Sequence, residues 1–108
     1  MTLPQSPHAQ TPIRVEISRD LEDIVPTFLE NRGKDLQTLH VAVVSQDFST
    51  LQTLGHRMKG DGGGYGFDAI STIGARLETA AKQQDLPVSK HLIAELEDFL
   101  NRVTVLYR

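Results

Sequence analysis

The sequence contains no cysteine and no surplus of basic residues. Without cysteine there are no disulfides, no thiolate nucleophile and no cysteine-based zinc site. Eleven Lys and Arg residues against fourteen Asp and Glu give a formal net charge of −3, whereas proteins that bind nucleic acid usually carry a basic excess. We therefore expect no nucleic acid among the partners.

Long apolar runs are also absent. The longest is Val41–Val44, far short of the roughly 18 residues of a membrane span. The first twelve residues contain no Lys or Arg and no apolar segment of the kind that marks a secretory signal. We expect the chain to stay in the cytoplasm, without contact with a membrane.

The composition is that of one small globular domain. Hydrophobic residues make up 39% and charged residues 23% of 108 residues, which is enough apolar material for one core. Residues 1–12 contain three prolines and few large apolar groups, so we expect a flexible, disordered N-terminal arm followed by a folded domain over residues 13–108. Ile13–Ile17 alternates apolar and charged residues. Because no second strand is evident for it, we expect a strap lying on the core.

Beyond Ser18 the apolar residues recur at helical spacing. Pro26 should kink the first run or split it into a short and a long helix, and Asp47 is a suitable N-cap for the next helix. Two more helices are expected over about residues 67–84 and from Pro87 to the C-terminus. The sequence thus predicts an all-α fold, an antiparallel four-helix bundle with an additional short N-terminal helix.

The most informative residue is His56. On a helix it lies opposite the apolar stripe that contains Leu54 and Met58, so its ring should face solvent. Imidazole has an ordinary pKa of about 6.5, and its neutral form carries a free nitrogen lone pair, which makes an exposed ring a natural nucleophile. Lys59, one turn further, would help to neutralise a phosphoryl group on that ring.

Five glycines follow within residues 60–66. Each costs a helix roughly 1 kcal/mol relative to alanine, so their concentration needs a reason. They could allow close packing between helices, or simply end the helix in a loop. Alternatively, they could keep the surface beside His56 flat so that another protein can approach the ring.

The segment 54–67 resembles the signature of histidine-containing phosphotransfer (HPt) domains. That signature has a histidine, Lys-Gly at the third and fourth positions after it, small residues, and a glycine at the tenth position followed by an apolar residue. Here His56, Lys59, Gly60, Gly66 and Phe67 fill these positions, and the resemblance extends over about residues 18–106.

The resemblance implies a role for each site residue. His56 would accept a phosphoryl group at Nε2, Lys59 would stabilise the phosphoryl oxygens, and Glu78 would hold Nδ1. The surface that meets the partner would include Gln52, Thr53, Arg57, Gly60, Gly63 and Gly64. Asp61 departs from the family pattern, which has a small residue there more often, and its carboxylate could repel phosphate or affect the choice of partner.

The resemblance also implies the partners. The chain would be a phosphocarrier and not an enzyme, exchanging its phosphoryl group with a response-regulator receiver domain or a sensor histidine kinase. The receiver domain would supply the acceptor aspartate, the magnesium ion and most of the catalysis. We expect no cofactor and no metal bound to this chain itself, and we expect it to be monomeric.

The sequence also bears on three alternatives to a phosphocarrier. Gly64-Tyr65-Gly66-Phe67-Asp68-Ala69 fits a G-x-G-x-x-A nucleotide-binding pattern, but the strand that gives this motif its meaning is missing. No two of the four histidines are three or four residues apart, so a helical metal site has no support. The remaining alternative is a helical adaptor that binds or sequesters a receiver domain or kinase without being phosphorylated.

Overall fold

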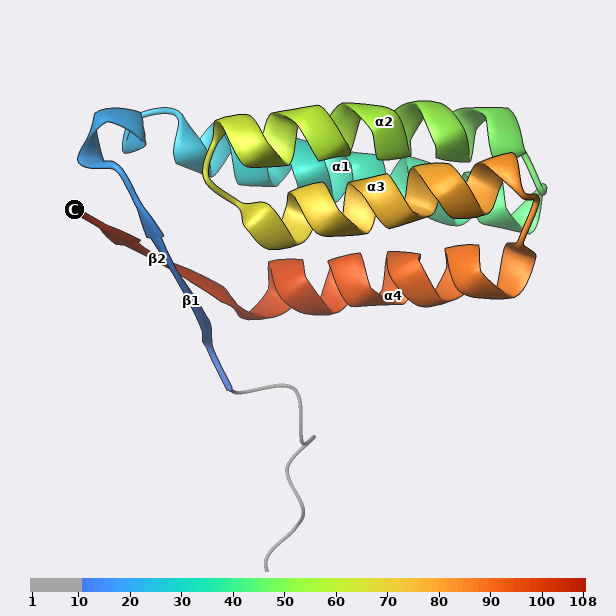
Figure 1. The fold of residues 1–108 in the computed structure, drawn as a ribbon. Coiled ribbons are helices and arrows are strands. Elements are labelled where there is room, and N and C mark those ends of the chain that lie inside the picture. The colour runs from blue at the N-terminus through green and yellow to red at the C-terminus, as the bar shows by residue number, and fades with distance from the viewer. Residues whose placement is uncertain (1–10) are drawn as a thin grey trace, which may run out of the picture.

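The computed structural model describes residues 11–108, so the expected arm over residues 1–12 lies outside the described residues except for its last two positions. Four helices make up most of the structure: α1 (Val25–Val44), α2 (Phe48–Gly64), α3 (Asp68–Lys82) and α4 (Leu86–Arg102). They lie alongside one another and are joined by short turns at alternating ends (Figure 1). The prediction of four packed helices is confirmed.

The helix starts follow from capping residues. The Asp47 side chain accepts a hydrogen bond from the Thr50 N–H (3.1 Å), and Asp85 does the same for Val88 (3.1 Å). Hydrogen bonds from the Thr50 hydroxyl and N–H hold the pKa of Asp47 below its ordinary value. Pro26 lies in the first turn of α1, where a missing N–H costs nothing. Pro26 therefore begins the helix and does not kink it.

The region before α1 differs from the expectation. The residues Arg19–Leu21 form a single 3-10 turn, η1, where we expected an additional short N-terminal helix. Ser18 caps this turn by accepting a hydrogen bond from the Asp20 N–H (3.2 Å). None of the three side chains is fully buried, but Leu21 packs against the edge of the core while the turn connects the preceding segment to α1.

A two-stranded parallel sheet is the main correction to the sequence-based fold. Ile13–Ile17 is a strand, β1, and pairs with β2, Val103–Tyr107, in the register Ile13↔Val103 to Ile17↔Tyr107. The strap interpretation was wrong because the last helix stops at Arg102 instead of running to the C-terminus. The β-branched residues at the start of β2 favour the extended conformation. The fold is thus a helical bundle with a small sheet and is not purely α-helical.

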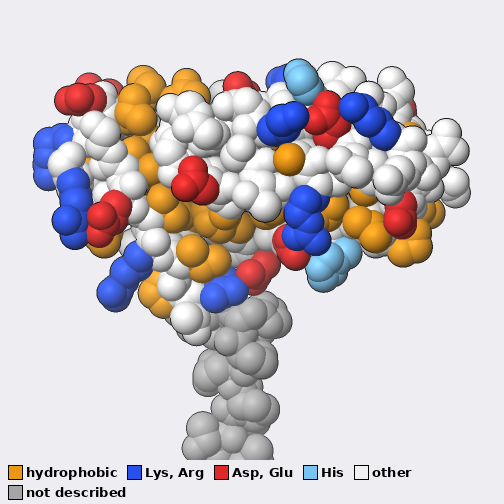
Figure 2. Space-filling model, viewed as in Figure 1, with side chains coloured by type: hydrophobic (Ala, Val, Ile, Leu, Met, Phe, Trp, Pro, Cys, Tyr) orange, Lys and Arg blue, Asp and Glu red, His pale blue; other side chains and the backbone are white. Residues whose placement is uncertain are grey.

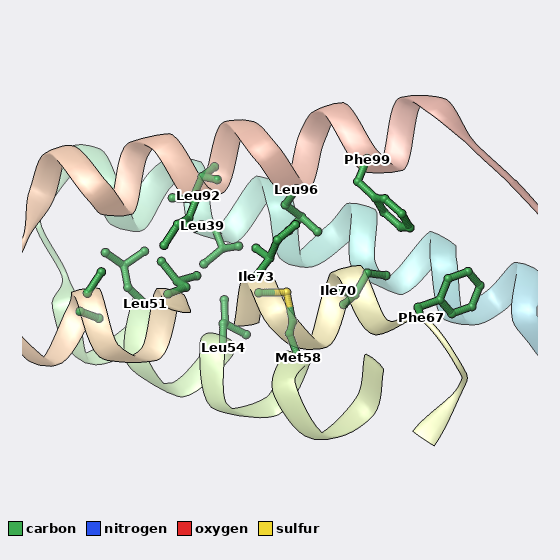
Figure 3. Close-up of a cluster of buried hydrophobic side chains, with 14 of the residues drawn as sticks. Leu39, Leu51, Leu54, Met58, Phe67, Ile70, Ile73, Leu92, Leu96 and Phe99 are labelled. Carbon is green, nitrogen blue, oxygen red and sulfur yellow. The ribbon is translucent and has the colours of Figure 1, made fainter. Parts of the chain in front are cut away.

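The apolar stripes of the four helices meet in one core (Figure 3). Leu39 of α1, Met58 of α2, Leu77 of α3 and Leu96 of α4 are all fully buried. Phe67, in the turn between α2 and α3, is fully buried as well and stacks on Phe28, with ring centroids 5.4 Å apart. Packing at this turn fixes the position of the end of α2 relative to α1.

The surface carries charges of both signs. On the face shown in Figure 2, basic and acidic side chains are interspersed with hydrophobic ones, and neither sign forms a large continuous area. Within residues 11–108, none of the helices combines the length and the apolar character needed to cross a lipid bilayer.

Candidate functional site

Two glycines bring the backbones of α2 and α3 into direct contact. A Cβ atom added to Gly55 would lie 2.7 Å from the Glu78 nitrogen, and one added to Gly74 would lie 2.5 Å from the Lys59 nitrogen. No real side chain fits at such distances, so only glycine permits this approach. The contact places the α2 residues next to Gly55 against the last turns of α3.

His56 and Glu78 are brought together by this contact. The His56 ring is 67% exposed, and its Nδ1 lies 2.9 Å from Glu78 Oε2. Glu78 is only 13% exposed, so its carboxylate sits at the base of the site while the imidazole extends outward. The ring nitrogen on the far side from Glu78, Nε2, is the one directed away from this buried contact.

The electrostatics of Glu78 fix the roles in this hydrogen bond. Burial raises the pKa of Glu78, but the hydrogen bond from His56 and the charges of Lys59, His56 and Lys82 outweigh it and hold the pKa below the ordinary value of 4.5. Near neutral pH Glu78 is a carboxylate that can only accept. Nδ1 of His56 must therefore carry the proton, which leaves the lone pair of a neutral ring on Nε2.

Two lysines flank the same carboxylate. Lys59 Nζ lies 3.5 Å from Glu78 Oε1, and Lys82 Nζ lies 4.0 Å from Glu78 Oε2. Both lysine side chains are more than half exposed, so their ammonium groups stay accessible to a ligand on the imidazole. Lys59, expected to contact phosphoryl oxygens, is thus paired with Glu78 in the absence of a phosphoryl group.

Two other histidines in residues 11–108 also contact glutamates, and the comparison is informative. His40 Nε2 lies 3.4 Å from Glu97 and His91 Nε2 lies 3.2 Å from Glu95. In both pairs the glutamate contacts Nε2, and it is at least 36% exposed. Only the His56 pair in this range combines an Nδ1 contact with a mostly buried carboxylate and adjacent lysines.

The residues expected to meet a partner all lie on α2. Thr53, Arg57, Gly60, Gly63 and Gly64 are exposed, and Gln52 is half-buried. Arg57 makes no ion pair among the described residues. Within residues 11–108, no hydrogen bond or ion pair joins any of these six residues to the imidazole, and their part in partner binding stays a prediction.

The glycines on α2 divide into two groups. The glycines up to Gly64 are helical, and α2 ends at Gly64, so the loop interpretation holds only for Gly66 in the turn that follows. Gly62 faces α3, where an added Cβ would lie 2.5 Å from the Ser71 nitrogen, which is the close packing considered above. Gly60 and Gly64 have nothing within 4 Å of such a Cβ. These two glycines leave flat helix surface beyond Lys59.

Asp61 is engaged on another side of α2. Its carboxylate lies 3.7 Å from Arg32 Nη1 of α1, whereas His56 contacts α3. Arg32 is buried, stacks over the Phe28 ring at 4.7 Å and is also held by Asp35 at 2.9 Å. The Asp61 charge is therefore partly neutralised by a buried guanidinium.

Sequence reasoning missed three contributors to this site. Lys82 lies four residues after Glu78 on the predicted helix, a spacing that could have identified it. Gly74 lies four residues before Glu78 and could have been found in the same way. The Ser71 hydroxyl donates a hydrogen bond to the Lys59 carbonyl (2.6 Å). That contact joins two helices, so no local pattern signals it.

Comparison with known proteins gives one match. The family model of the Hpt domain matches residues 23–104, which is well over half of the chain. No curated protein and no solved structure matches significantly. The matched range contains α1 to α4 and the His56 site on α2 and α3. The chain belongs to the Hpt domain family, whose members are phosphocarriers with a histidine phosphotransfer role in two-component phosphorelays.

Proposed function

We propose that His56 accepts a phosphoryl group at Nε2 and exchanges it with the aspartate of a response-regulator receiver domain. The observation that carries this proposal is the 2.9 Å contact between Nδ1 and the Glu78 carboxylate beneath an exposed ring. It leaves a nucleophilic lone pair on the nitrogen that a partner can reach. The carboxylate also stabilises positive charge on the ring during attack.

The step is a displacement at phosphorus. The Nε2 lone pair forms the N–P bond while the bond from phosphorus to the aspartyl oxygen breaks, and the aspartate leaves as a carboxylate. No proton needs to move, because Nδ1 keeps its hydrogen in the bond with Glu78. Transfer in the opposite direction reverses these bonds, so the same geometry serves both.

Lys59 would follow the phosphoryl group. An incoming phosphoryl group brings close to two negative charges, and Lys59 is within one helical turn of His56 with its ammonium accessible. We expect Lys59 to exchange its contact with Glu78 for the phosphoryl oxygens, while Lys82 continues to balance the carboxylate.

The partner would approach along α2. Gln52, Thr53 and Arg57 lie around His56, and the open surface at Gly60, Gly63 and Gly64 leaves room for a receiver domain beyond Lys59. In this proposal the receiver supplies the aspartate and the magnesium ion. The chain contributes an oriented nucleophile and a cation, and its location in the cytoplasm would match that of its partners.

The test is phosphorylation of the histidine-to-glutamine variants. Wild type, His56→Gln and His91→Gln are incubated with a panel of phosphorylated receiver domains and with a sensor kinase. His91 is the matched control, since it is equally exposed and also contacts a glutamate. We expect acid-labile label on wild type and His91→Gln, and none on His56→Gln.

The same experiment separates the carrier from the adaptor. Acid-labile label retained on His56→Gln would refute the assignment of the acceptor. If no member of the panel labels wild type, although one of them binds it in a pull-down that His56→Gln leaves unchanged, the chain is an adaptor. Circular dichroism of each variant checks that the exposed substitution leaves the helices intact.

A further inference from the structure

Strand β1 carries opposite charges on one face. Arg14 and Glu16 are exposed on one face of the strand. The three aliphatic residues, Ile13, Val15 and Ile17, lie on the other face and pack against the core. Val15 lies midway between the two charges. If the strand is turned end for end about Val15, the arginine and the glutamate exchange positions.

The backbone groups of these two charged residues point to the edge of β1 that no strand within residues 11–108 covers. In the ladder with β2, the Arg108 N–H donates to the Ile17 carbonyl (3.0 Å) and the Arg19 N–H donates to the Arg108 carbonyl (2.9 Å). Backbone groups of successive strand residues point to opposite sides, so those of Arg14 and Glu16 point away from β2. Within residues 11–108, β2 is the only strand paired with β1.

We propose that β1 pairs with β1 of a second copy of this chain, antiparallel and centred on Val15. In this register Arg14 of each copy lies opposite Glu16 of the other, and each such pair exchanges two N–H···O hydrogen bonds. The result is a symmetric dimer with a four-stranded sheet, in which the same surface is used by both copies. An isolated two-stranded sheet gains most from such an extension.

Charge selects both the register and the edge. A shift by two residues in either direction places Arg14 opposite Arg14, or Glu16 opposite Glu16, and like charges directly opposite are destabilising. The other open edge, that of β2, contains no acid between Val103 and Tyr107 and is flanked by Arg102 and Arg108. Antiparallel pairing of two β2 strands about their midpoint would form no acid–base pair between strand residues, and the flanking Arg102 and Arg108 are already paired with Asp98 and Glu16 of their own chain.

The association should be weak, which qualifies the expectation of a monomer. A stable interface buries at least about 1,200 Å², and the pairing of two five-residue strands covers much less. We expect a dissociation constant of about 0.1–1 mM, with monomers dominating in dilute solution. Glu16 also contacts Arg108 of its own chain at 2.8 Å through Oε2, so its second oxygen is the one offered to Arg14 of the other copy.

Sedimentation velocity on the full chain over a series reaching millimolar concentration tests the charge pairing. Arg14→Glu and Glu16→Arg each place like charges opposite in the symmetric dimer, so each should weaken self-association by about tenfold. Mixing the two variants should restore association, because one strand is then wholly acidic and the other wholly basic. The double variant R14E/E16R should match wild type, although it loses the intrachain contact with Arg108.

Disulfide trapping tests the register. The chain has no cysteine, so Val15→Cys introduces a single thiol at the centre of the pairing, where opposed Cα atoms are about 4.5 Å apart and within disulfide range. Val105→Cys is the matched control, a valine at the corresponding position of β2. We expect Val15→Cys to form a covalent dimer at least about tenfold faster than Val105→Cys.

Three results would overturn the proposal. The first is that the wild-type chain stays monomeric into the millimolar range. The second is that a mixture of R14E and E16R associates no better than either variant alone. The third is that Val15→Cys and Val105→Cys crosslink at equal rates. The charge variants lie at exposed positions, so they remain decisive if Val15→Cys does not fold.

Discussion

Replacement of Gly74 by alanine should separate the two helices that form the site. The added Cβ would lie 2.5 Å from the Lys59 nitrogen and 2.7 Å from the Gly55 carbonyl oxygen. Both neighbours are backbone atoms of α2 and cannot rotate away. To reach an ordinary contact of 3.4 Å, the helices must move apart by about 0.9 Å.

That displacement exceeds what the His56–Glu78 contact tolerates. Added to the present 2.9 Å, it would stretch the distance to about 3.8 Å, beyond hydrogen-bond range. The ring would lose the acceptor that fixes its tautomer, and we expect transfer from a phosphorylated receiver to slow by about 10- to 100-fold. Overpacking costs about 1–3 kcal/mol, which the better helix propensity of alanine offsets by about 1 kcal/mol.

The control is Gly33→Ala on α1, because nothing lies within 4 Å of a Cβ at that position. It should leave transfer unchanged and raise stability by up to about 1 kcal/mol. Urea unfolding and single-turnover transfer are measured on both variants. If Gly74→Ala transfers at the wild-type rate with unchanged stability, the glycine contact does not position His56 and our reasoning about it is wrong.

Three further predictions concern the charged residues. The folded pKa of Glu78 lies below 4.5, so the contribution of the carboxylate to stability is complete above pH 4.5 and is lost as the pH falls through the folded pKa. Glu78→Gln should therefore flatten the acid side of a plot of Tm against pH. Parallel plots for the wild type and the variant would contradict this. Lys59→Ala should slow phosphoryl transfer or shorten the lifetime of the phosphorylated form, with little change in Tm because the side chain is half exposed. A large fall in Tm at an unchanged transfer rate would show that Lys59 has a structural role instead. Asp61→Asn should cost less than about 1 kcal/mol in urea unfolding, since the carboxylate is 50% exposed. Asp35→Asn should cost about 1.5–3 kcal/mol, because a neutral amide oxygen then replaces the carboxylate that lies 2.9 Å from the buried Arg32. Equal costs would contradict the difference in burial.

The helices were predictable where local signals act alone. Asp47, Asp85 and Pro87 mark helix starts through interactions within one turn, and the structure uses them in this way. The buried positions Ile70, Ile73 and Leu77 of α3 follow directly from the 3.6-residue period. Such features depend on neighbours along the chain, so a sequence pattern contains the needed information.

The sheet was missed because its information is non-local. Val103 and Leu106 fit a helical spacing, while Val103, Val105 and Tyr107 fit an alternating one, and a run this short does not distinguish them. The structure follows the alternating pattern, since Leu106 is exposed (42%) and β2 pairs with β1, far away in the sequence. Pairing with β1 adds to the local preference of the β-branched residues for the extended conformation.

The site was predictable in part for the same reason. The face of α2 that carries His56 follows from the helical period, and Glu78 came from the family resemblance. The contacts of Lys59 with Glu78 and of Asp61 with Arg32 each join two helices. The first contact depends on how closely α2 and α3 approach, which the glycines at 55 and 74 set. The second depends on how α1 packs against α2, and no local pattern reveals either.

The central claim is that Nε2 of His56 is the nucleophile, and ¹⁵N NMR of the histidine-labelled protein before and after phosphorylation tests it most directly. Before phosphorylation, His56 should show a protonated Nδ1 and a free lone pair on Nε2. Afterwards, one of the four histidines should carry an N–P bond, at Nε2 of His56. Phosphorus on Nδ1 of His56, or on another histidine, would contradict the assignment of Glu78 as the group that directs the reactive nitrogen outward.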